Sequence, residues 1–499
     1  MLPQHLEKIY KNIAQITPSL LKEQYLREAG LLKQMNLNKL PRILFDQKSI
    51  QLLQLYNPQT YRDKAIFFEI VDYYLNYKLM DQYEVLLKKL YSPINMHGRT
   101  ISFQKLQDLI LNPYYQQKKE CLFNLFINRL TEVDSLLKKL FVSRWEILQE
   151  KFNFNNPLEF YALKKGLDYN ALNKIFSALS KEIDDFYKKC IWEWIENNFS
   201  GKYSYKNSPR SYIAVELIAS NDFISYFSST KQVKSFLNVL DRLDLMDIFI
   251  RSVKIDSHDR TKKTSRPACF AVNIPGEIYI ITRKRNGYES YRALFHEGGH
   301  ATCLATIPSR TPFYKKYWTK SGAIFELPAF LFESLIRNPL WLQQEMKIPH
   351  NKIRNIIYYG TLYDLFLLKR YIAKFFYEFW LYKENLTNIN FKKAQVVYSH
   401  NLTRETGFLY NKTMYLYDID PGIYSADYVR AWIGRESLIN YLESNFSPKW
   451  FNNKRAGIFL KKLWQNGFQK DMEELFADFK ITDSLNYKDL IQKYKSLIS

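Results

Sequence analysis

The sequence predicts a mainly α-helical protein with one small β-sheet. Three observations support this fold class. Apolar residues recur at three- and four-residue spacing from residue 1 to about 195, which is the period of helices with one buried face. The stretch 269–282 instead has the composition of two short strands joined by a turn. The rest of the chain returns to helical spacing, and 499 residues are enough for one large domain or two lobes with a substantial core.

The N-terminal part contains clear amphipathic helix patterns, for example at 85–90 and 133–141. It shows no repeat of fixed period and no low-complexity linker. We therefore predict a helical N-terminal lobe over 1–195 and a second lobe over 196–499, the two forming one continuous fold. Short breaks in the helical pattern occur at Asn112-Pro113, Asn156-Pro157 and Ser200-Gly201.

Composition indicates an ordinary soluble globular protein. Apolar residues make up 46% and charged residues 24% of the chain. The 72 basic and 50 acidic residues give a net charge of +22, but the basic residues are spread along the chain without a block of five or six. No nucleic-acid-binding motif accompanies this charge, so we expect a basic solvated surface and no nucleic-acid partner.

Targeting and membrane segments are not expected. The N-terminus lacks the apolar core and small-residue cleavage site of a signal peptide. The longest hydrophobic stretch, which begins at Ile356, contains five charged residues and therefore suits a long core helix better than a membrane span. Four cysteines lie far apart with no Cys-x-x-Cys pair, which predicts free, mostly buried thiols in a reducing compartment. We expect a cytoplasmic protein with no membrane partner.

The two predicted strands are Cys269–Ile274 and Ile278–Thr282, joined by a turn at Pro275-Gly276. Directly after them, residues 291–304 read YRALFHEGGHATCL. The strands therefore lead into the segment that carries the chemistry.

His296 and His300 are four residues apart, which places both imidazoles on one face of a helix. Two neutral imidazoles suit zinc, and the adjacent Glu297 can act as a general base on a metal-activated water. The alternative is two surface histidines on an ordinary helix. That alternative leaves Gly298 and Gly299 unexplained, because a mid-helix glycine costs about 1 kcal/mol relative to alanine. Close approach of another backbone explains them better.

A catalytic zinc usually has three protein ligands and one open position. Thr306 occupies the place of a third histidine six residues after His300, and residues 318–322 contain no carboxylate. The first acidic residue after His300 is Glu326, which we predict to be the third ligand. Glu333 follows two helical turns later on the same face, where it can hydrogen-bond a ligating histidine. The alternative is that both glutamates are solvated.

The segments HEGGHA at 296–301 and FELPAFLFES at 325–334 resemble the thimet oligopeptidase and oligoendopeptidase F family of zinc metallopeptidases. Members carry a His-Glu-Phe-Gly-His-like motif and, downstream, a Phe-Val-Glu-x-Pro-Ser-x-x-x-Glu-like segment whose first Glu is the third ligand. Here Gly298 replaces the usual Phe and Ala329 the usual Ser. The stretch ACFAVNIP at 268–275 resembles the edge strand over the family's substrate channel.

The stretch DIDPGIYSADYVRAW at 418–432 resembles the family's Gly-Tyr-x-x-x-Tyr loop. The resemblance implies that Tyr424 and Tyr428 stabilise the tetrahedral intermediate, which suits a phenol donor. Ile419 stands near the position where many members carry a histidine. For Arg430 we expect a structural salt bridge rather than a contact with a peptide carboxylate.

Taken over the whole chain, the resemblance implies a two-lobed helical body with a deep channel that admits short, unstructured peptides. The lobe 196–499 would be the zinc-peptidase lobe, holding one zinc ion per chain. We therefore predict a cytoplasmic oligoendopeptidase that cuts internal bonds of short peptides. The alternatives are a metallocarboxypeptidase of the helical His-Glu-x-x-His type and a catalytically inactive basic binding protein. Cleavage preference, oligomeric state and the physiological metal do not follow from the sequence.

Overall fold

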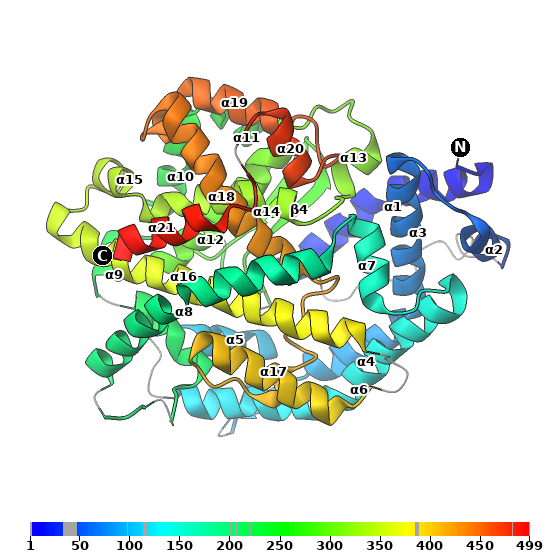
Figure 1. Cartoon of the computed structure of the whole chain (residues 1–499), viewed down its shortest axis with the longest axis horizontal. Helices are drawn as coiled ribbons and strands as arrows, with labels where there is room; N and C mark the ends of the chain where they lie inside the picture. The colour runs from blue at the N-terminus through cyan, green and yellow to red at the C-terminus, as the bar shows by residue number, and fades with distance from the viewer. Residues whose placement is uncertain are drawn as a thin grey trace.

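The computed structural model describes residues 2–32, 47–96, 98–112, 118–199, 201–204, 207–219, 221–260, 262–264, 266–384, 389–481 and 483–498. These residues form a mainly helical body with two small sheets (Figure 1). The prediction of a mainly α fold with a small sheet is confirmed.

The α-helices are α1 (Gln4–Glu28), α2 (Gln47–Leu55), α3 (Tyr61–Lys78), α4 (Met80–Leu90), α5 (Phe103–Leu111), α6 (Lys119–Phe152), α7 (Pro157–Lys165), α8 (Tyr169–Asn198), α9 (Asn221–Tyr226), α10 (Gln232–Arg242), α11 (Met246–Ser252), α12 (Tyr288–Thr306), α13 (Phe313–Tyr317), α14 (Ala323–Ser334), α15 (Pro339–Gln344), α16 (His350–Lys383), α17 (Phe391–Thr406), α18 (Tyr424–Phe446), α19 (Lys454–Trp464), α20 (Met472–Asp478) and α21 (Tyr487–Ile498). Short 3₁₀ helices are η3 (Ser211–Ile218), η4 (Leu335–Arg337), η6 (Lys412–Met414) and η7 (Trp450–Asn452). The strands are β1 (Ile94–Met96), β2 (Arg99–Ile101), β3 (Val253–Asp256), β4 (Ala268–Asn273) and β5 (Glu277–Ile281).

The predicted strand pair is present as β4 and β5, which pair antiparallel. The sequence did not indicate β3, which joins the same sheet parallel to β5, or the short hairpin of β1 and β2. These strands have only three or four residues each, too few to show an alternating pattern. The strand order β3-β5-β4 places β4 at an edge, as the resemblance implied.

The three-stranded sheet is covered on both faces, because successive side chains of a strand point to opposite sides. On one face, Phe270 and Tyr279 pack with Tyr25 of α1, and the rings of Tyr25 and Tyr279 stack at 3.9 Å. On the other face, Ile278 and Ile280 join the main core, which contains buried residues of α12. The N-terminal helix and the histidine-bearing helix therefore hold the sheet between them.

Helix ends follow local signals where the structure describes them. Asn112 is the residue after α5. Asn156 precedes α7, accepts the backbone N–H of Glu159 at 2.9 Å and is followed by Pro157 at the first helical position. Pro113 and Ser200, from the other predicted breaks, lie outside the described residues.

The largest hydrophobic core takes residues from both predicted lobes, from Leu2 to Ile498. In Figure 1 the long helices α8 and α16 cross the middle of the molecule side by side. α8 ends at Asn198, close to the predicted boundary at residue 195. The shared core agrees with one continuous fold, and the division into lobes stays a prediction.

The hydrophobic stretch from Ile356 forms most of α16, as predicted for a core helix. Its buried charges are paired: Asp364 accepts a hydrogen bond from Arg337 at 2.9 Å, and Lys369 lies 2.8 Å from Glu405. Over the described residues, no helix is both long and apolar enough to cross a membrane.

Candidate active site

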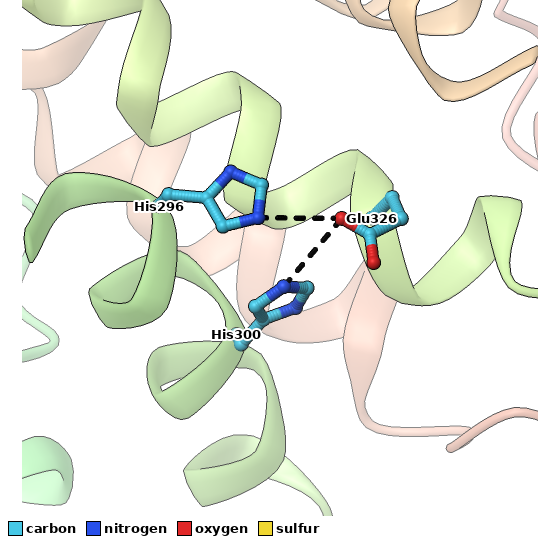
Figure 2. Close-up of side chains that lie close together, drawn as sticks. All are labelled: His296, His300 and Glu326. Atoms are coloured by element: carbon cyan, nitrogen blue, oxygen red, sulfur yellow. Dashed lines mark ion pairs between the residues drawn. The ribbon is translucent and has the colours of Figure 1, made fainter. Parts of the chain in front are cut away.

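His296 and His300 of α12 face Glu326 of α14, as Figure 2 shows. Nε2 of His296 lies 3.4 Å, and Nε2 of His300 3.6 Å, from Oε2 of Glu326. One ligand atom from each of the three residues lies within 4.8 Å of the others. The structure thus brings together the three residues that the sequence predicted as metal ligands.

Of the two mid-helix glycines, Gly299 permits this approach and Gly298 makes room for a ring of another helix. A Cβ atom on Gly299 would lie 2.5 Å from the carbonyl oxygen of Pro328 and 2.7 Å from Cα of Ala329, too close for any side chain. A Cβ atom on Gly298 would lie 2.4 Å from the ring of Phe236. Gly299 therefore lets the backbones of α12 and α14 touch, which places Glu326 opposite both histidines.

α14 starts at Ala323, so Glu326 lies in its first turn and Pro328 lies inside the helix. Proline lacks a backbone N–H, so one helical hydrogen bond is missing at this point. The missing bond falls on the stretch of α14 that touches Gly299.

The donor atoms fit a divalent metal such as zinc. Ligand atoms about 2.0–2.1 Å from a tetrahedral zinc lie roughly 3.3–3.4 Å apart, close to the observed separations. Within the described part of the chain, Oε2 of Glu326 is buried and has no hydrogen-bond partner. An ionised oxygen in this position is costly unless a cation balances it, so the residues present suit a metal.

Glu333 contacts His296 at the ring nitrogen that does not face Glu326. Its Oε2 lies 2.8 Å from Nδ1 of His296, and its other oxygen lies 3.2 Å from Arg292. Burial favours a neutral Glu333, but the charges of Arg292 and His296 outweigh burial and hold the pKa of this carboxyl well below its usual range. An ionised Glu333 that accepts Nδ1–H leaves Nε2 of His296 free to bind a metal.

Burial also sets the protonation of the other site residues. Burial lowers the pKa of His300 to about 4, so its ring is neutral as a ligand must be. For His296, burial is outweighed by the nearby carboxylates of Glu326 and Glu333, which raise its pKa to about 10, so metal binding displaces a proton there. Burial and the nearby charge of Glu326 raise the pKa of Glu297 to about 7, close to the value that suits a general base.

Glu297 belongs to α12, and its side chain reaches the edge strand β4. Its carboxylate is hydrogen-bonded to the backbone of Cys269 in β4, and Cys269 lines a cavity. The predicted base is therefore next to the strand along which an extended peptide can lie.

The two predicted tyrosines lie on the first two turns of α18. The hydroxyl of Tyr424 donates to Oε1 of Glu326 at 2.7 Å. Burial raises the pKa of Tyr424 well above its ordinary value, so this phenol remains a proton donor. The ring of Tyr428 packs against Tyr424 at 5.1 Å and against Tyr371 at 4.5 Å. Tyr424 thus contacts the predicted ligand Glu326 directly, whereas Tyr428 packs against rings and lines the smaller cavity.

Arg430 is fully buried among carboxylates. It lies 2.7 Å from Asp471 and 3.3 Å from Asp427, and it is also paired with Glu473. The predicted structural salt bridge is confirmed. All four cysteines are free thiols, as predicted: Cys190 and Cys303 are buried, Cys269 is half-buried, and Cys121 is exposed.

One residue near the site was missed by sequence reasoning. Lys165, at the end of α7, donates to the carbonyl of Gly422 at 2.5 Å and to Asp427 at 2.6 Å. Its Nζ lies 5.7 Å from the ring centroid of Tyr424. A lysine in the predicted N-terminal lobe therefore anchors the start of α18, where Tyr424 lies. No local pattern marks it, because its partners follow more than 250 residues later.

Two cavities border the site. The larger, about 1600 Å³, is lined by Cys269, Leu304, Phe325 and Tyr424, among others. The smaller, about 840 Å³, is lined by residues that include Ala293 and Tyr428. The smaller cavity borders α12 at Ala293 and the larger borders it at Leu304, so the two histidines lie between these positions along the helix, and neither histidine lines either cavity.

No family model and no curated protein matches the sequence. Solved structures do match over nearly the whole chain. PZ peptidase A has a TM-score of 0.62 and 13% identity, with 97% of this chain and 85% of that chain covered. An M32 carboxypeptidase from Deinococcus radiodurans R1 has a TM-score of 0.61 and 12% identity, with 99% of each chain covered.

A structure described as an oligoendopeptidase F from Bacillus anthracis has a TM-score of 0.56 and 14% identity, with 99% of this chain and 84% of that chain covered. At such low identities the similarity shows the fold and not the activity. The predicted resemblance therefore extends to the whole architecture, which oligoendopeptidase F and M32 carboxypeptidases share with this chain.

Proposed function

We propose that this protein is a zinc-dependent oligoendopeptidase that hydrolyses internal bonds of short peptides. The convergence of His296, His300 and Glu326 on one point carries the proposal. The position of Glu297 beside this point and beside an edge strand supports it.

A zinc ion held by His296, His300 and Glu326 would polarise the peptide carbonyl and activate a water molecule. Glu333 keeps the ring of His296 in the tautomer and orientation that ligation requires. Gly299 keeps α14 close enough for Glu326 to complete the set. The protein would thus supply three ligands, the number that catalytic zinc sites usually take from the protein.

Glu297 takes a proton from the attacking water and passes it to the leaving amine. A carboxyl with a pKa near 7 can perform both transfers, because neither its ionised nor its neutral form is strongly favoured near neutral pH. Tyr424 keeps its proton and lies against Glu326, where its hydroxyl can turn to stabilise the oxyanion.

The two cavities support an internal position of the cleaved bond, because one borders α12 before the histidines and the other after them, which leaves room for a peptide to continue in both directions. One observation favours a metallocarboxypeptidase as the second candidate. The chain spans 99% of the M32 carboxypeptidase but only 84–85% of PZ peptidase A and the oligoendopeptidase F.

The test is hydrolysis of internally quenched short peptides by wild type, by Glu297→Gln and by the control Glu193→Gln, which changes an exposed carboxylate on α8. We expect internal cleavage by wild type and control, and at least about a hundredfold lower kcat in Glu297→Gln with unchanged zinc content. Mass spectrometry of the products separates internal cuts from release of single C-terminal residues. If wild type binds zinc but cleaves none of the peptides, the result would contradict the proposed peptidase activity. It would then favour a catalytically inactive binding protein.

A further inference from the structure

The two cavities beside the histidines meet at one place. Thr264, Arg266, Pro267 and Tyr417 line both of them. Arg266 and Pro267 lead directly into β4, the edge strand whose Cys269 contacts the carboxylate of Glu297. A peptide that lies along β4 at the proposed base therefore passes close to the junction.

The smaller cavity is lined by more cationic than anionic side chains. The cationic ones are Arg266, Arg283, Arg285, Arg292, Arg370 and Lys374, and the anionic ones are Asp108, Glu289, Asp418 and Asp420. Which of these charges is available to a ligand depends on the partners that each one already has.

All of these cations except Arg266 pair with a carboxylate of the protein. The pairs are Arg285 with Asp108 at 2.6 Å, Arg292 with Glu289 at 2.8 Å and Glu333 at 3.2 Å, Arg370 with Asp418 at 2.5 Å, Lys374 with Asp420 at 2.7 Å, and Arg283 with Asp259 at 3.4 Å. The partners hold these side chains in place and balance their charges.

Arg266 differs from the others. Its side chain is exposed, and it forms no ion pair within the described ranges. Its charge acts on Tyr417 and Asp418, which places the guanidinium near the wall of the junction. An arginine has a planar fork of donors that binds a carboxylate through two parallel hydrogen bonds, and here the fork is available.

We propose that Arg266 binds a carboxylate of the peptide substrate and so determines a preference for peptides that carry one at this distance from the cleaved bond. The inference rests on the proposed peptidase function and adds a substrate class to it. The carboxylate belongs either to an Asp or Glu side chain or to the C-terminus of the peptide. The recognition chemistry is the same, and the two sources predict different substrates.

The experiment uses one quenched peptide sequence in matched versions. One pair differs by a free C-terminal carboxylate or its amide, and a second series differs by Glu or Gln at each position on either side of the cleaved bond. We expect wild type to prefer a carboxylate over its neutral counterpart by about tenfold in kcat/KM, mainly through KM. Loss on amidation identifies the C-terminal carboxylate, and loss on the change from Glu to Gln identifies a side chain.

Arg266→Ala is expected to remove this preference and Arg266→Glu to reverse it toward Lys-containing peptides. Arg310→Ala is the control, because Arg310 is an exposed arginine beyond the end of α12 that lines neither cavity. A preference that survives in Arg266→Ala, or equal rates of wild type on all versions, would overturn the inference.

Binding of fluorescent versions of the same peptides to Glu297→Gln, with and without Arg266→Ala, measures recognition without hydrolysis. Carboxylate-dependent binding that requires Arg266 would support the inference even if wild type hydrolysed nothing, whereas absent hydrolysis alone would contradict only the peptidase. Binding that ignores both the carboxylate and Arg266 would overturn the inference.

Discussion

The surroundings of individual side chains determine the protonation state that each one has in the site. His300 and Glu297 are both buried on α12, and burial disfavours the charged form of each. The same cause lowers the pKa of the histidine and raises that of the glutamate. The histidine is thus neutral, as a metal ligand must be, and the glutamate can exchange protons near neutral pH, as the proposed base requires.

Glu333→Gln tests the support of His296. The neutral amide binds Nδ1–H more weakly than a carboxylate does, so we expect the affinity for zinc to fall about 10- to 100-fold. Competition with a chromophoric chelator measures the affinity, and Glu193→Gln is the control. Unchanged zinc affinity would mean that the packing of α12 alone orients the ring.

Tyr424→Phe and Tyr428→Phe separate the two tyrosines. Tyr424 donates to Glu326, whereas Tyr428 mainly packs against neighbouring rings. We expect kcat to fall about 10²- to 10³-fold in Tyr424→Phe with KM and zinc content little changed, and less than tenfold in Tyr428→Phe. Steady-state kinetics on one quenched peptide checks this. Equal losses would assign the oxyanion role to both, as the sequence implied.

At the level of secondary structure, the site depends on how closely α12 and α14 pack. Gly299→Ala places a methyl group against the backbone of Pro328, and a backbone cannot turn away as a side chain can. We expect the helices to separate, with loss of zinc binding and a decrease of about 1–3 kcal/mol in the free energy of unfolding. Thermal unfolding and zinc content measure the two effects.

Gly276→Ala is the matched control for this substitution. Its added Cβ atom would come no closer than 4.0 Å to the carbonyl of Asn273, and its backbone does not require glycine. It should leave zinc binding and stability within about 0.5 kcal/mol of wild type. Equal effects of both substitutions would contradict the role of helix contact.

In the molecule as a whole, charges buried between distant segments link stability to pH. Glu378 of α16 accepts the backbone N–H of Asp420 at 2.7 Å and the hydroxyl of Ser425, and so holds the loop before α18. Burial and the charge of Asp420 raise its pKa from 4.5 to about 8. Its contribution to the free energy of unfolding is therefore full below about pH 4.5 and is lost as the pH rises to about 8.

Glu378→Gln keeps an acceptor for Asp420 and gains a donor for Ser425, but it does not titrate. Relative to wild type, the variant should therefore gain stability between pH 5 and pH 8, by an amount of order 1–3 kcal/mol. Urea unfolding at several pH values measures the difference, with Glu193→Gln as control. A difference independent of pH would show that Glu378 is ionised in the folded protein.

The sequence by itself determined the features that depend on short separations. Helical period places His296 and His300 on one face, and a search for the next carboxylate finds Glu326, because few residue types can complete such a set. The strands on either side of Pro275-Gly276 were also predicted, since turn and strand signals are local. Two adjacent glycines in a helix indicated a close contact without identifying the partner.

Tertiary structure alone decided which distant segments meet at the site. It brought Lys165 to the start of α18, turned the Tyr424 hydroxyl toward Glu326 and added β3 to the sheet. At the junction of the two cavities it left Arg266 with no ion pair among the described residues. An apolar period shows which face of a helix is buried but not what covers it. Partners hundreds of residues apart are chosen by the packing of the whole core, which no local pattern records.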